Sequence, residues 1–269
     1  MSRKYDIICP IIENTRVASN TFLMRMAAPE IAKNIRPGQF VMVHTSVEPR
    51  ANPLLRRPFS IHRTTLEGEM FILYRPVGSE TGRMSKMGPG EKLKVLGPLG
   101  NGFDLGLAER EAYLVAGGVG LAPIWALAEA LQGKAETRLF YGLRSADEVV
   151  DFISGASGPV QPDEVIITTE DGSAGTGGLV TEPLAKALES RPAPVFACGP
   201  RPMLAAIAAL AREAGVKAQV SLEERMACGM GLCMSCSVET ADSTSAEPAY
   251  IRVCKEGPVF NAEEVKWQI

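Results

Sequence analysis

The sequence predicts a multi-domain β and α/β protein, with an N-terminal antiparallel β-barrel, a parallel-sheet α/β domain and a small C-terminal cysteine-rich domain. Short apolar or alternating runs broken by Gly and Pro occupy residues 3–105. From about residue 111 each apolar run is followed by a helical pattern, and four of the six cysteines gather near the end of the chain. These changes of pattern predict domains at 1–106, 107–222 and 223–269.

The six apolar runs of the first domain are expected to be strands, because each is short, rich in β-forming residues and bounded by turn residues. Several such strands separated by Gly and Pro are typical of an antiparallel barrel. The expected strands span 5–11, 21–27, 38–45, 58–64, 70–77 and 92–98.

The second domain alternates strand and helix patterns, which indicates a parallel sheet covered by helices. The expected strand and helix pairs are 112–118 with 122–133, 137–144 with 146–155, 163–170 with 179–190, and 193–200 with 201–215. In the last helix Met203, Ile207, Leu210 and Ala214 recur at three- and four-residue spacing, so we expect them to be its buried face.

Composition limits the function classes. A chain of 269 residues with 46% hydrophobic residues can bury ordinary cores, and its formal charge of −3 offers no basic field for nucleic acid or anionic lipid. No apolar run approaches a membrane span, and the N-terminal residues lack the apolar core of a signal peptide. We therefore expect a cytoplasmic protein with a small-molecule or protein partner, and no binding to nucleic acid or membrane.

The tail contains the segment MACGMGLCMSC, in which three cysteines follow C-x4-C-x2-C spacing, with a fourth cysteine downstream. This is the ligand pattern of a plant-type [2Fe–2S] cluster. Gly229 and Gly231 permit the positive φ angles that a tight loop around the cluster needs. The predicted metal ligands are Cys228, Cys233, Cys236 and Cys254.

A structural zinc site is the alternative for four thiolates. Zinc sites usually combine two C-x2-4-C pairs, whereas here the fourth cysteine stands alone, so the spacing favours the cluster. A Rieske centre needs two histidine ligands. The only two histidines, His44 and His62, lie in the barrel segment and not near the cysteines, so a Rieske centre is excluded. Of the remaining cysteines, Cys9 is expected to be a small buried apolar residue.

Two segments of the barrel could hold a flavin dinucleotide. In RRPFSIH, Arg57 can offer a guanidinium to a pyrophosphate and Ser60 a hydroxyl to a ring edge. In YRPVGSETG, Tyr74 and Arg75 precede a predicted turn whose backbone N–H groups could bind phosphate. The alternative is that these side chains simply face solvent, as Arg and Ser on strands often do.

In the second domain, Gly117, Gly118 and Gly120 lie between the first strand and the first helix, where a pyrophosphate can approach a helix N-terminus. A tight turn without a ligand is the alternative. The segment Cys198-Gly199-Pro200 ends the fourth strand, at the edge where α/β folds bind ligands. A buried cysteine before a turn that starts a helix is the alternative for this segment. Glu170 and Asp171 would accept ribose hydroxyls and repel a 2′-phosphate, which favours NAD over NADP, although solvated loop acids remain an alternative.

Taken together, RPFS, YRPVG, GPLGNGF, AGGVGLAP, ACGPRPM and SLEERMACGMGLCMSC…VCKEGPVF resemble the electron-transfer subunits of dihydroorotate dehydrogenase B, in the ferredoxin reductase superfamily. The resemblance covers nearly the whole chain. It implies FAD in the barrel, NAD as co-substrate on the α/β domain and a [2Fe–2S] cluster on the tail. It also implies an FMN-containing catalytic subunit that oxidises dihydroorotate to orotate in pyrimidine biosynthesis, assembled with this chain as two copies of each.

The resemblance also assigns residues to the two nucleotides. FAD would be held by Arg57, Pro58, Phe59, Ser60, Tyr74, Arg75, Pro76, Gly78, Thr81 and Gly82. NAD would lie against Gly117, Gly118, Gly120 and Pro123, with Glu170, Asp171, Cys198, Gly199 and Pro200 around it. The sequence departs from the family pattern at Glu80, where the family has glycine before the threonine.

The predicted function is therefore that of an oxidoreductase subunit. Electrons would pass from dihydroorotate through the FMN of the partner, the tail cluster and FAD to NAD+, and the dihydroorotate chemistry itself would need no catalytic residue in this chain. The tail, which carries the cluster, is the expected docking surface. The alternatives are the FAD and [2Fe–2S] subunit of a ferredoxin:NADP oxidoreductase or a sulfhydrogenase, and a non-catalytic zinc-binding module.

Overall fold

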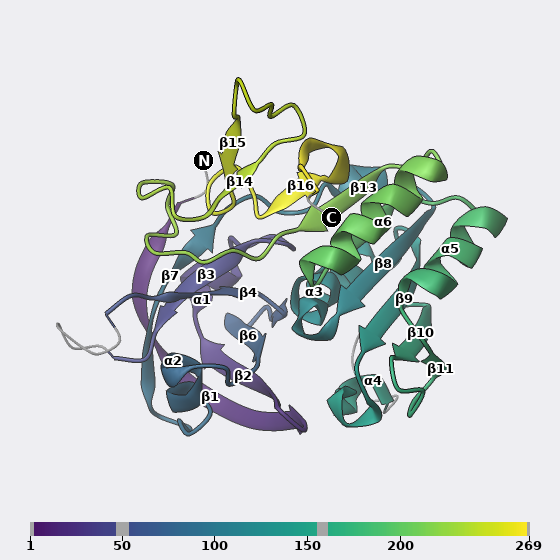
Figure 1. Ribbon diagram of the computed structural model, residues 1–269. Coiled ribbons are helices and arrows are strands. Elements are labelled where there is room, and N and C mark those ends of the chain that lie inside the picture. The colour runs from purple at the N-terminus through teal and green to yellow at the C-terminus, as the bar shows by residue number, and fades with distance from the viewer. Residues whose placement is uncertain (1–2, 47–53, 155–160, 268–269) are drawn as a thin grey trace.

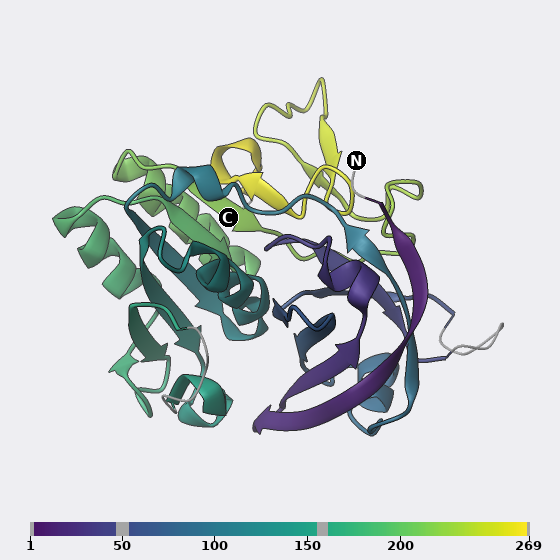
Figure 2. The same ribbon diagram turned by 180° about the vertical axis from the view of Figure 1, so that it is seen from behind.

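The computed structural model describes residues 3–46, 54–154 and 161–267. An N-terminal β-barrel and an α/β domain lie side by side, and the C-terminal tail lies across both (Figures 1 and 2). This is the predicted fold class. Within the described residues, no helix combines the length and the apolar composition that a membrane span requires.

The barrel is a seven-stranded antiparallel sheet with the strand order β4-β3-β7-β1-β2-β6-β5. Side chains that alternate along β3 and β7, such as Val41, Val43 and Val95, point into its core with Met24 and Ile72. The sheet forms an open half-barrel from β1 (Tyr5–Ala18), β2 (Thr21–Ala27), β3 (Phe40–His44), β4 (Arg57–Ser60), β5 (Arg63–Thr64), β6 (Glu69–Tyr74) and β7 (Lys92–Leu99).

Two short helices, α1 (Pro29–Ala32) and α2 (Ser79–Met84), complete the barrel. The turn that the sequence predicts after Tyr74 and Arg75, with Gly78, Thr81 and Gly82, is instead the N-terminal part of α2. The Thr81 hydroxyl accepts hydrogen bonds from the backbone N–H of Val77 at 2.9 Å and of Gly78 at 3.1 Å, which caps the helix. Glu80 is buried, and its carboxylate accepts a hydrogen bond from the backbone N–H of Thr45 at 2.7 Å, so it links α2 to the end of β3.

The α/β domain contains a second seven-stranded sheet, ordered β11-β10-β9-β8-β12-β13-β16 and parallel from β11 to β13. Helix α3 packs on one face of this sheet, and α5 and α6 pack on the other. The strands are β8 (Glu111–Gly117), β9 (Glu136–Leu143), β10 (Glu164–Thr169), β11 (Thr176–Gly177), β12 (Val195–Cys198) and β13 (Ala218–Ser221). The helices are α3 (Leu121–Leu131), α4 (Asp151–Ser154), α5 (Thr181–Ser190) and α6 (Arg201–Glu213).

Two helix predictions need correction. The buried face of α6 is formed by Leu204, Ile207 and Ala211, because these residues point at the sheet; Met203, Leu210 and Ala214 flank them and are only partly buried. The helix predicted at 146–155 is a 3₁₀ turn at Ala146–Glu148 followed by α4, and residue 155 lies outside the described residues.

The tail contains β14 (Ser237–Glu239), β15 (Tyr250–Arg252) and β16 (Val259–Asn261). The first two pair with each other, while β16 pairs antiparallel with β13 and so extends the sheet of the α/β domain. Phe260 and Val265 of the tail share one apolar core with Met42 of the barrel and Val220 of β13. The tail is therefore packed into both larger domains.

Candidate functional site

The cysteine loop follows β13 and folds tightly because of two glycines. Gly229 has φ of 68° and Gly231 has φ of 81°, the left-handed region that glycine adopts at little cost. A Cβ on Gly229 would lie 2.5 Å from Cγ of Met42, and a Cβ on Gly231 would lie 2.6 Å from Cδ of Lys255. The loop thus depends on both glycines for its backbone conformation, on Gly229 for close packing on the barrel and on Gly231 for close packing on Lys255 of the tail.

The four cysteine thiols in this loop and after β15 lie as two neighbouring pairs. The side chains of Cys228 and Cys233 are within hydrogen-bonding reach of each other, and so are those of Cys236 and Cys254. The pairs adjoin, because consecutive backbone N–H groups of the loop reach both: those of Met230 and Leu232 point at Cys228, and that of Gly231 points at Cys254. The fold brings all four predicted metal ligands together.

Backbone N–H groups of the loop point at the sulfurs. Met230 and Leu232 donate to Sγ of Cys228 at 3.4 and 3.3 Å, and Gly231 donates to Sγ of Cys254 at 3.1 Å. Burial alone would raise the pKa of Cys228, but the backbone donors lower it overall. Such donors stabilise thiolates and, in iron–sulfur proteins, tune the reduction potential.

The two pairs differ in environment. Hydrogen bonding to Ser235 lowers the pKa of the exposed Cys233 to about 6. Burial, and then the neighbouring Cys236, raises the pKa of Cys254 to about 12. One pair therefore faces solvent at the loop tip, and the other lies against the protein core.

This arrangement can be tested against the metal centres that four cysteines could hold. A zinc ion needs its four thiolates around one centre, whereas a two-iron cluster with four cysteines takes two thiolates on each iron. The observed pairs match the donor set of a two-iron cluster.

On the barrel, the RPFS segment forms the whole of β4 at the edge of the sheet. The ring of Phe59 meets that of Tyr74 edge-on, with centroids 6.1 Å apart, so β4 and the end of β6 present one surface. Nη1 of Arg57 donates to the backbone carbonyl of Leu55 at 2.6 Å, and no ion pair of Arg57 occurs within the described residues. An arginine without a carboxylate partner is available for a phosphate.

Open space adjoins this surface. A Cβ built on Gly78 or on Gly82 would meet no atom within 4 Å, and Val77 is 83% exposed. The hydroxyl of Tyr74 turns inward and donates to Oδ1 of Asn14 at 3.0 Å, and burial raises the pKa of Tyr74 to about 12. The residues present therefore fit the large phosphate-bearing cofactor that the sequence predicted.

The three glycines after β8 do not have one common role. A Cβ on Gly117 would lie 2.7 Å from Cδ of Pro200, and a Cβ on Gly120 would lie 2.2 Å from the carbonyl oxygen of Cys198. These two glycines permit the close packing of adjacent strand ends. Gly118, half-buried with φ of 55°, is the one that faces the seam between the domains, where a Cβ would lie 3.4 Å from Nη2 of Arg75.

The other predicted nucleotide-binding residues lie at the same edge of the sheet, because β8, β10 and β12 are parallel. Cys198 is fully buried, and burial and then the charge of Glu223 raise the pKa of its thiol. Pro123 is buried in the first turn of α3. Glu170 and Asp171 follow β10 on the surface, and Oδ1 of Asp171 accepts a hydrogen bond from the backbone N–H of Ser173 at 2.9 Å.

The cluster loop and the barrel surface share a strand pair. Gly229 packs on Met42 of β3, and Met42 lies opposite Pro58 of β4 in the sheet register. The predicted cluster site thus packs on β3, and the predicted flavin site includes the neighbouring strand β4. This contact could not be predicted from the sequence, because it joins residues far apart in the chain.

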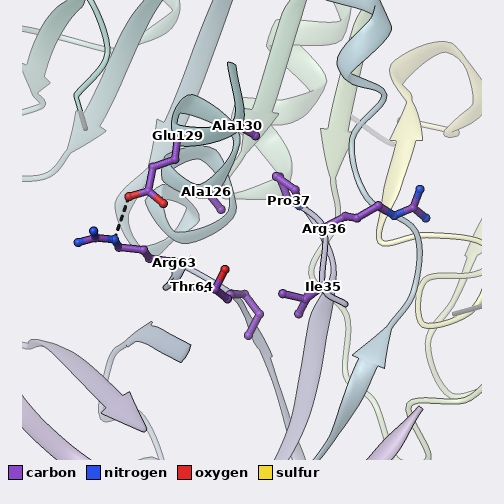
Figure 3. Close-up of a pocket in the computed structure, with 9 residues that line it drawn as sticks. Ile35, Arg36, Pro37, Arg63, Thr64, Ala126, Glu129 and Ala130 are labelled. Carbon is purple, nitrogen blue, oxygen red and sulfur yellow. Dashed lines mark ion pairs between the residues drawn. The ribbon is translucent and has the colours of Figure 1, made fainter. Parts of the chain in front are cut away.

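A cavity of about 250 Å³ lies elsewhere, at the seam between the barrel and α3 (Figure 3). Its wall contains an ion pair between Nε of Arg63 and Oε1 of Glu129 at 3.2 Å, while the guanidinium of Arg36 points away from it. Burial raises the pKa of Glu129 to about 7, although Arg63 and Trp125 act in the opposite direction. None of the residues that the sequence predicts to bind a nucleotide lines this cavity.

Sequence reasoning missed two acidic residues near the nucleotide edge. Glu148 pairs with Arg75 across the seam at 3.0 Å, and Glu223 lies close enough to Cys198 to affect its pKa. Both are brought to the site by tertiary packing. The only signal for Glu223 was its position just before the cysteine motif.

Comparison with known families agrees with this architecture. Residues 223–266 match the iron–sulfur cluster binding domain of dihydroorotate dehydrogenase B, and residues 114–209 match the oxidoreductase NAD-binding domain. The fold and these matches define an NAD-linked oxidoreductase component that carries an iron–sulfur domain.

The chain is 37% identical to the electron transfer subunit of dihydroorotate dehydrogenase B (NAD(+)) from Desulforamulus reducens, over 100% of both chains. It is 38% identical to the subunit of the same name from Listeria monocytogenes, over 95% of this chain and 96% of the relative. The chain belongs to the family of dihydroorotate dehydrogenase B electron transfer subunits.

Solved structures show the same fold. One is the NADH-dependent reduced ferredoxin-NADP oxidoreductase, with 31% identity and a TM-score of 0.81 over 97% of this chain and 90% of that chain. Another is the ferredoxin reductase in carbazole 1,9a-dioxygenase, with 21% identity and a TM-score of 0.64 over 79% of this chain and 67% of that chain. The second likeness concerns the fold alone.

Proposed function

We propose that this subunit carries electrons from an FMN-containing, dihydroorotate-oxidising partner to NAD+, with a [2Fe–2S] cluster on its tail and FAD in its barrel. The observation that supports this most is the contact of the cysteine loop with the strand pair that bears RPFS. That contact keeps the two predicted cofactor sites close together. When bound, the cluster would pass electrons one at a time, and the flavin would collect two of them with a proton and deliver them to NAD+ as a hydride.

The chain's own residues prepare the cluster site. Cys228, Cys233, Cys236 and Cys254 supply four thiolates in two pairs, and the loop N–H groups stabilise their negative charge. Gly229 holds the loop against the barrel.

The barrel and the α/β domain supply the nucleotide sites. Arg57 offers a guanidinium that no described carboxylate neutralises, and the space beside Gly78 and Gly82 admits phosphates. Gly118 lets a nucleotide approach the end of β8 from the seam. Asp171 adds negative charge at the same edge, which disfavours a 2′-phosphate and supports NAD as the co-substrate.

The partner would dock at the tip of the cysteine loop. Three apolar side chains are exposed there beside the cysteines: Met230 at 39%, Leu232 at 78% and Met234 at 52%. Exposed apolar groups gathered in one short loop are typical of an interface. We infer that they are covered in a complex with two copies of each subunit.

The Cys233→Ala variant tests this function. It removes an exposed cluster ligand, so we expect orotate-coupled NADH formation by the complex to disappear and the iron content of the tail to fall. NADH oxidation by artificial acceptors should persist, because the flavin and nucleotide sites keep their residues. Cys9→Ala, which alters a buried thiol of the barrel core, is the matched control and should retain both activities. Normal orotate-coupled NADH formation by Cys233→Ala would refute the proposed role of the tail.

The likeness to the NADH-dependent reduced ferredoxin-NADP oxidoreductase supports a second candidate, a subunit of a ferredoxin-linked complex. The barrel and nucleotide segments fit both functions. Purification from the native organism separates them: co-purification with an FMN protein that oxidises dihydroorotate supports the first candidate, and reduction of NADP by ferredoxin without dihydroorotate activity supports the second.

A further inference from the structure

The side chain of Arg75 crosses from the barrel to the α/β domain. Its position in the sequence, next to Tyr74, had placed it in the flavin site. The contacts of its guanidinium that the structure shows are instead with the α/β domain: Nη2 donates to Oε2 of Glu148 at 3.0 Å and lies 3.4 Å from where a Cβ of Gly118 would be. The guanidinium therefore covers the one glycine of the loop that faces the seam.

Glu148 holds two arginines at this point. Its other oxygen, Oε1, accepts a hydrogen bond from Nε of Arg144 at 2.8 Å, and Glu148 as a whole is only 8% exposed. Hydrogen bonds and charge from Arg144 and Arg75 lower the pKa of Glu148, although its burial acts in the opposite direction. Glu148 is therefore shared by two guanidinium groups, and the carboxylates of Glu170 and Asp147 act on Arg144 as well.

The Arg75 guanidinium still has an unused donor. Its Nε is buried and has no hydrogen-bond acceptor among the described residues. An unpaired donor of a buried cation is costly, and a phosphate oxygen is the acceptor that arginine binds best. The 3₁₀ turn that carries Glu148 is itself tied to the predicted ribose site, because the Ser173 hydroxyl accepts from the backbone N–H of Ala146 at 2.7 Å and contacts Asp171.

We propose that Arg75 binds the pyrophosphate of the nicotinamide nucleotide, and that Glu148 is a positioning residue that holds Arg75 over Gly118 until the nucleotide arrives. The phosphate takes over the guanidinium from the carboxylate, and Arg144 keeps Glu148 neutralised. This inference rests on the proposed function, because it assumes that the nucleotide lies along the end of β8.

The test measures binding to the full-length, cofactor-loaded subunit by titration calorimetry, with ADP-ribose as a probe that has the pyrophosphate but no nicotinamide, and adenosine as a probe without phosphate. Arg75→Ala should weaken ADP-ribose binding about tenfold, equivalent to about 1.4 kcal/mol. Its FAD content and its affinity for adenosine should stay unchanged. Arg75→Lys should restore part of the lost affinity, because it returns the charge without the planar fork.

Glu148→Gln gives the opposite expectation. The amide oxygen can still orient Arg75, but the competing charge is gone, so ADP-ribose should bind about threefold more tightly, with a steeper dependence on salt. Arg25→Ala is the matched control, because Arg25 is another barrel arginine that pairs with carboxylates, Glu13 and Glu69, away from the seam. It should change no affinity.

Two outcomes would overturn this inference, and a third would overturn the proposed function on which it rests. Loss of FAD from Arg75→Ala with unchanged ADP-ribose affinity would return Arg75 to the flavin site and leave the proposed function intact. If Glu148→Gln and Arg75→Ala weakened ADP-ribose binding equally, the ion pair would be a structural contact between the domains and not a nucleotide-binding device. Failure of the unaltered subunit to bind ADP-ribose and NAD+ would instead contradict the nucleotide site of the proposed function.

Discussion

At the scale of single residues, Gly229 is the point where the cysteine loop presses most closely on the barrel. Its Gly229→Ala variant adds a methyl group 2.5 Å from Cγ of Met42, at a φ of 68° that alanine adopts poorly. The loop must then move, so we expect loss of cluster iron and a lower thermal midpoint. Overpacking of this kind costs about 1–3 kcal/mol. Iron analysis and thermal unfolding measure both effects.

Gly133→Ala is the matched control, because Gly133 has φ of 70° but no atom within 4 Å of its built Cβ. It carries the backbone strain without the collision and should keep its iron. Combining Gly229→Ala with Met42→Ala should recover part of the iron, because the smaller side chain makes room. Equal iron loss in Gly133→Ala and Gly229→Ala would show that packing on Met42 is unimportant.

Sequence reasoning worked at this scale where function depends on local spacing. Three of the cysteines lie at short intervals and the fourth follows in the same tail, in a spacing typical of one kind of metal centre, so their meeting could be predicted. Arg75 could not be assigned in the same way, because its direction depends on Glu148, which is brought to it by the packing of two domains. The same is true of Met42 beneath Gly229.

At the scale of elements, the periodicity of hydrophobic residues predicted the strands and helices that bury one side against a core. It failed where an element is short or buried on more than one side. Helix α2 has six residues and is stabilised by the Thr81 hydroxyl, so the sequence suggested only a turn. Helix α6 shows the limit of spacing alone: several apolar residues recur at helical intervals, and only contact with the sheet decides that Leu204 lies at the centre.

The contact between β5 and α3 carries a prediction on pH. Burial raises the pKa of Glu129 to about 7 from an ordinary value of 4.5, so the folded protein holds a proton there that the unfolded chain has released. Stability should therefore fall as pH rises from 4.5 to 7, and Glu129→Gln should remove this contribution. The difference between the thermal midpoint of Glu129→Gln and that of the unaltered protein should therefore increase in favour of the variant as the pH rises from 4.5 to 7.

The control for this prediction is Glu13→Gln. Glu13 also pairs with an arginine, Arg25, but its side chain is 55% exposed. This variant measures how losing a carboxylate paired with an arginine at the surface changes the thermal midpoint, for comparison with Glu129→Gln. A constant difference between Glu129→Gln and the unaltered protein would contradict a raised pKa at Glu129.

At the scale of the whole molecule, the three predicted domains are not three separate cores. One apolar cluster contains Phe40 and Met42 of the barrel, Val220 of the α/β domain and Phe260 of the tail. The tail also adds β16 to the edge of β13. The predicted boundary at 222 separates sequence patterns, while the packing runs across it, which is why pattern alone could not show how the tail is held.

Removal of residues 223–269 should therefore damage more than the cluster site. It uncovers the edge of β13, a template for aggregation, and takes Phe260 and Val265 from the shared core. Losing one large core side chain costs about 2–5 kcal/mol, against a total stability of about 5–15 kcal/mol for a typical domain. We expect a chain ending at residue 222 to aggregate or unfold without a cooperative transition, whereas full-length Cys233→Ala remains soluble and unfolds cooperatively. Calorimetry and size-exclusion chromatography of both chains test this; a monodisperse, cooperatively unfolding 1–222 chain would show that the larger domains form their cores without the tail.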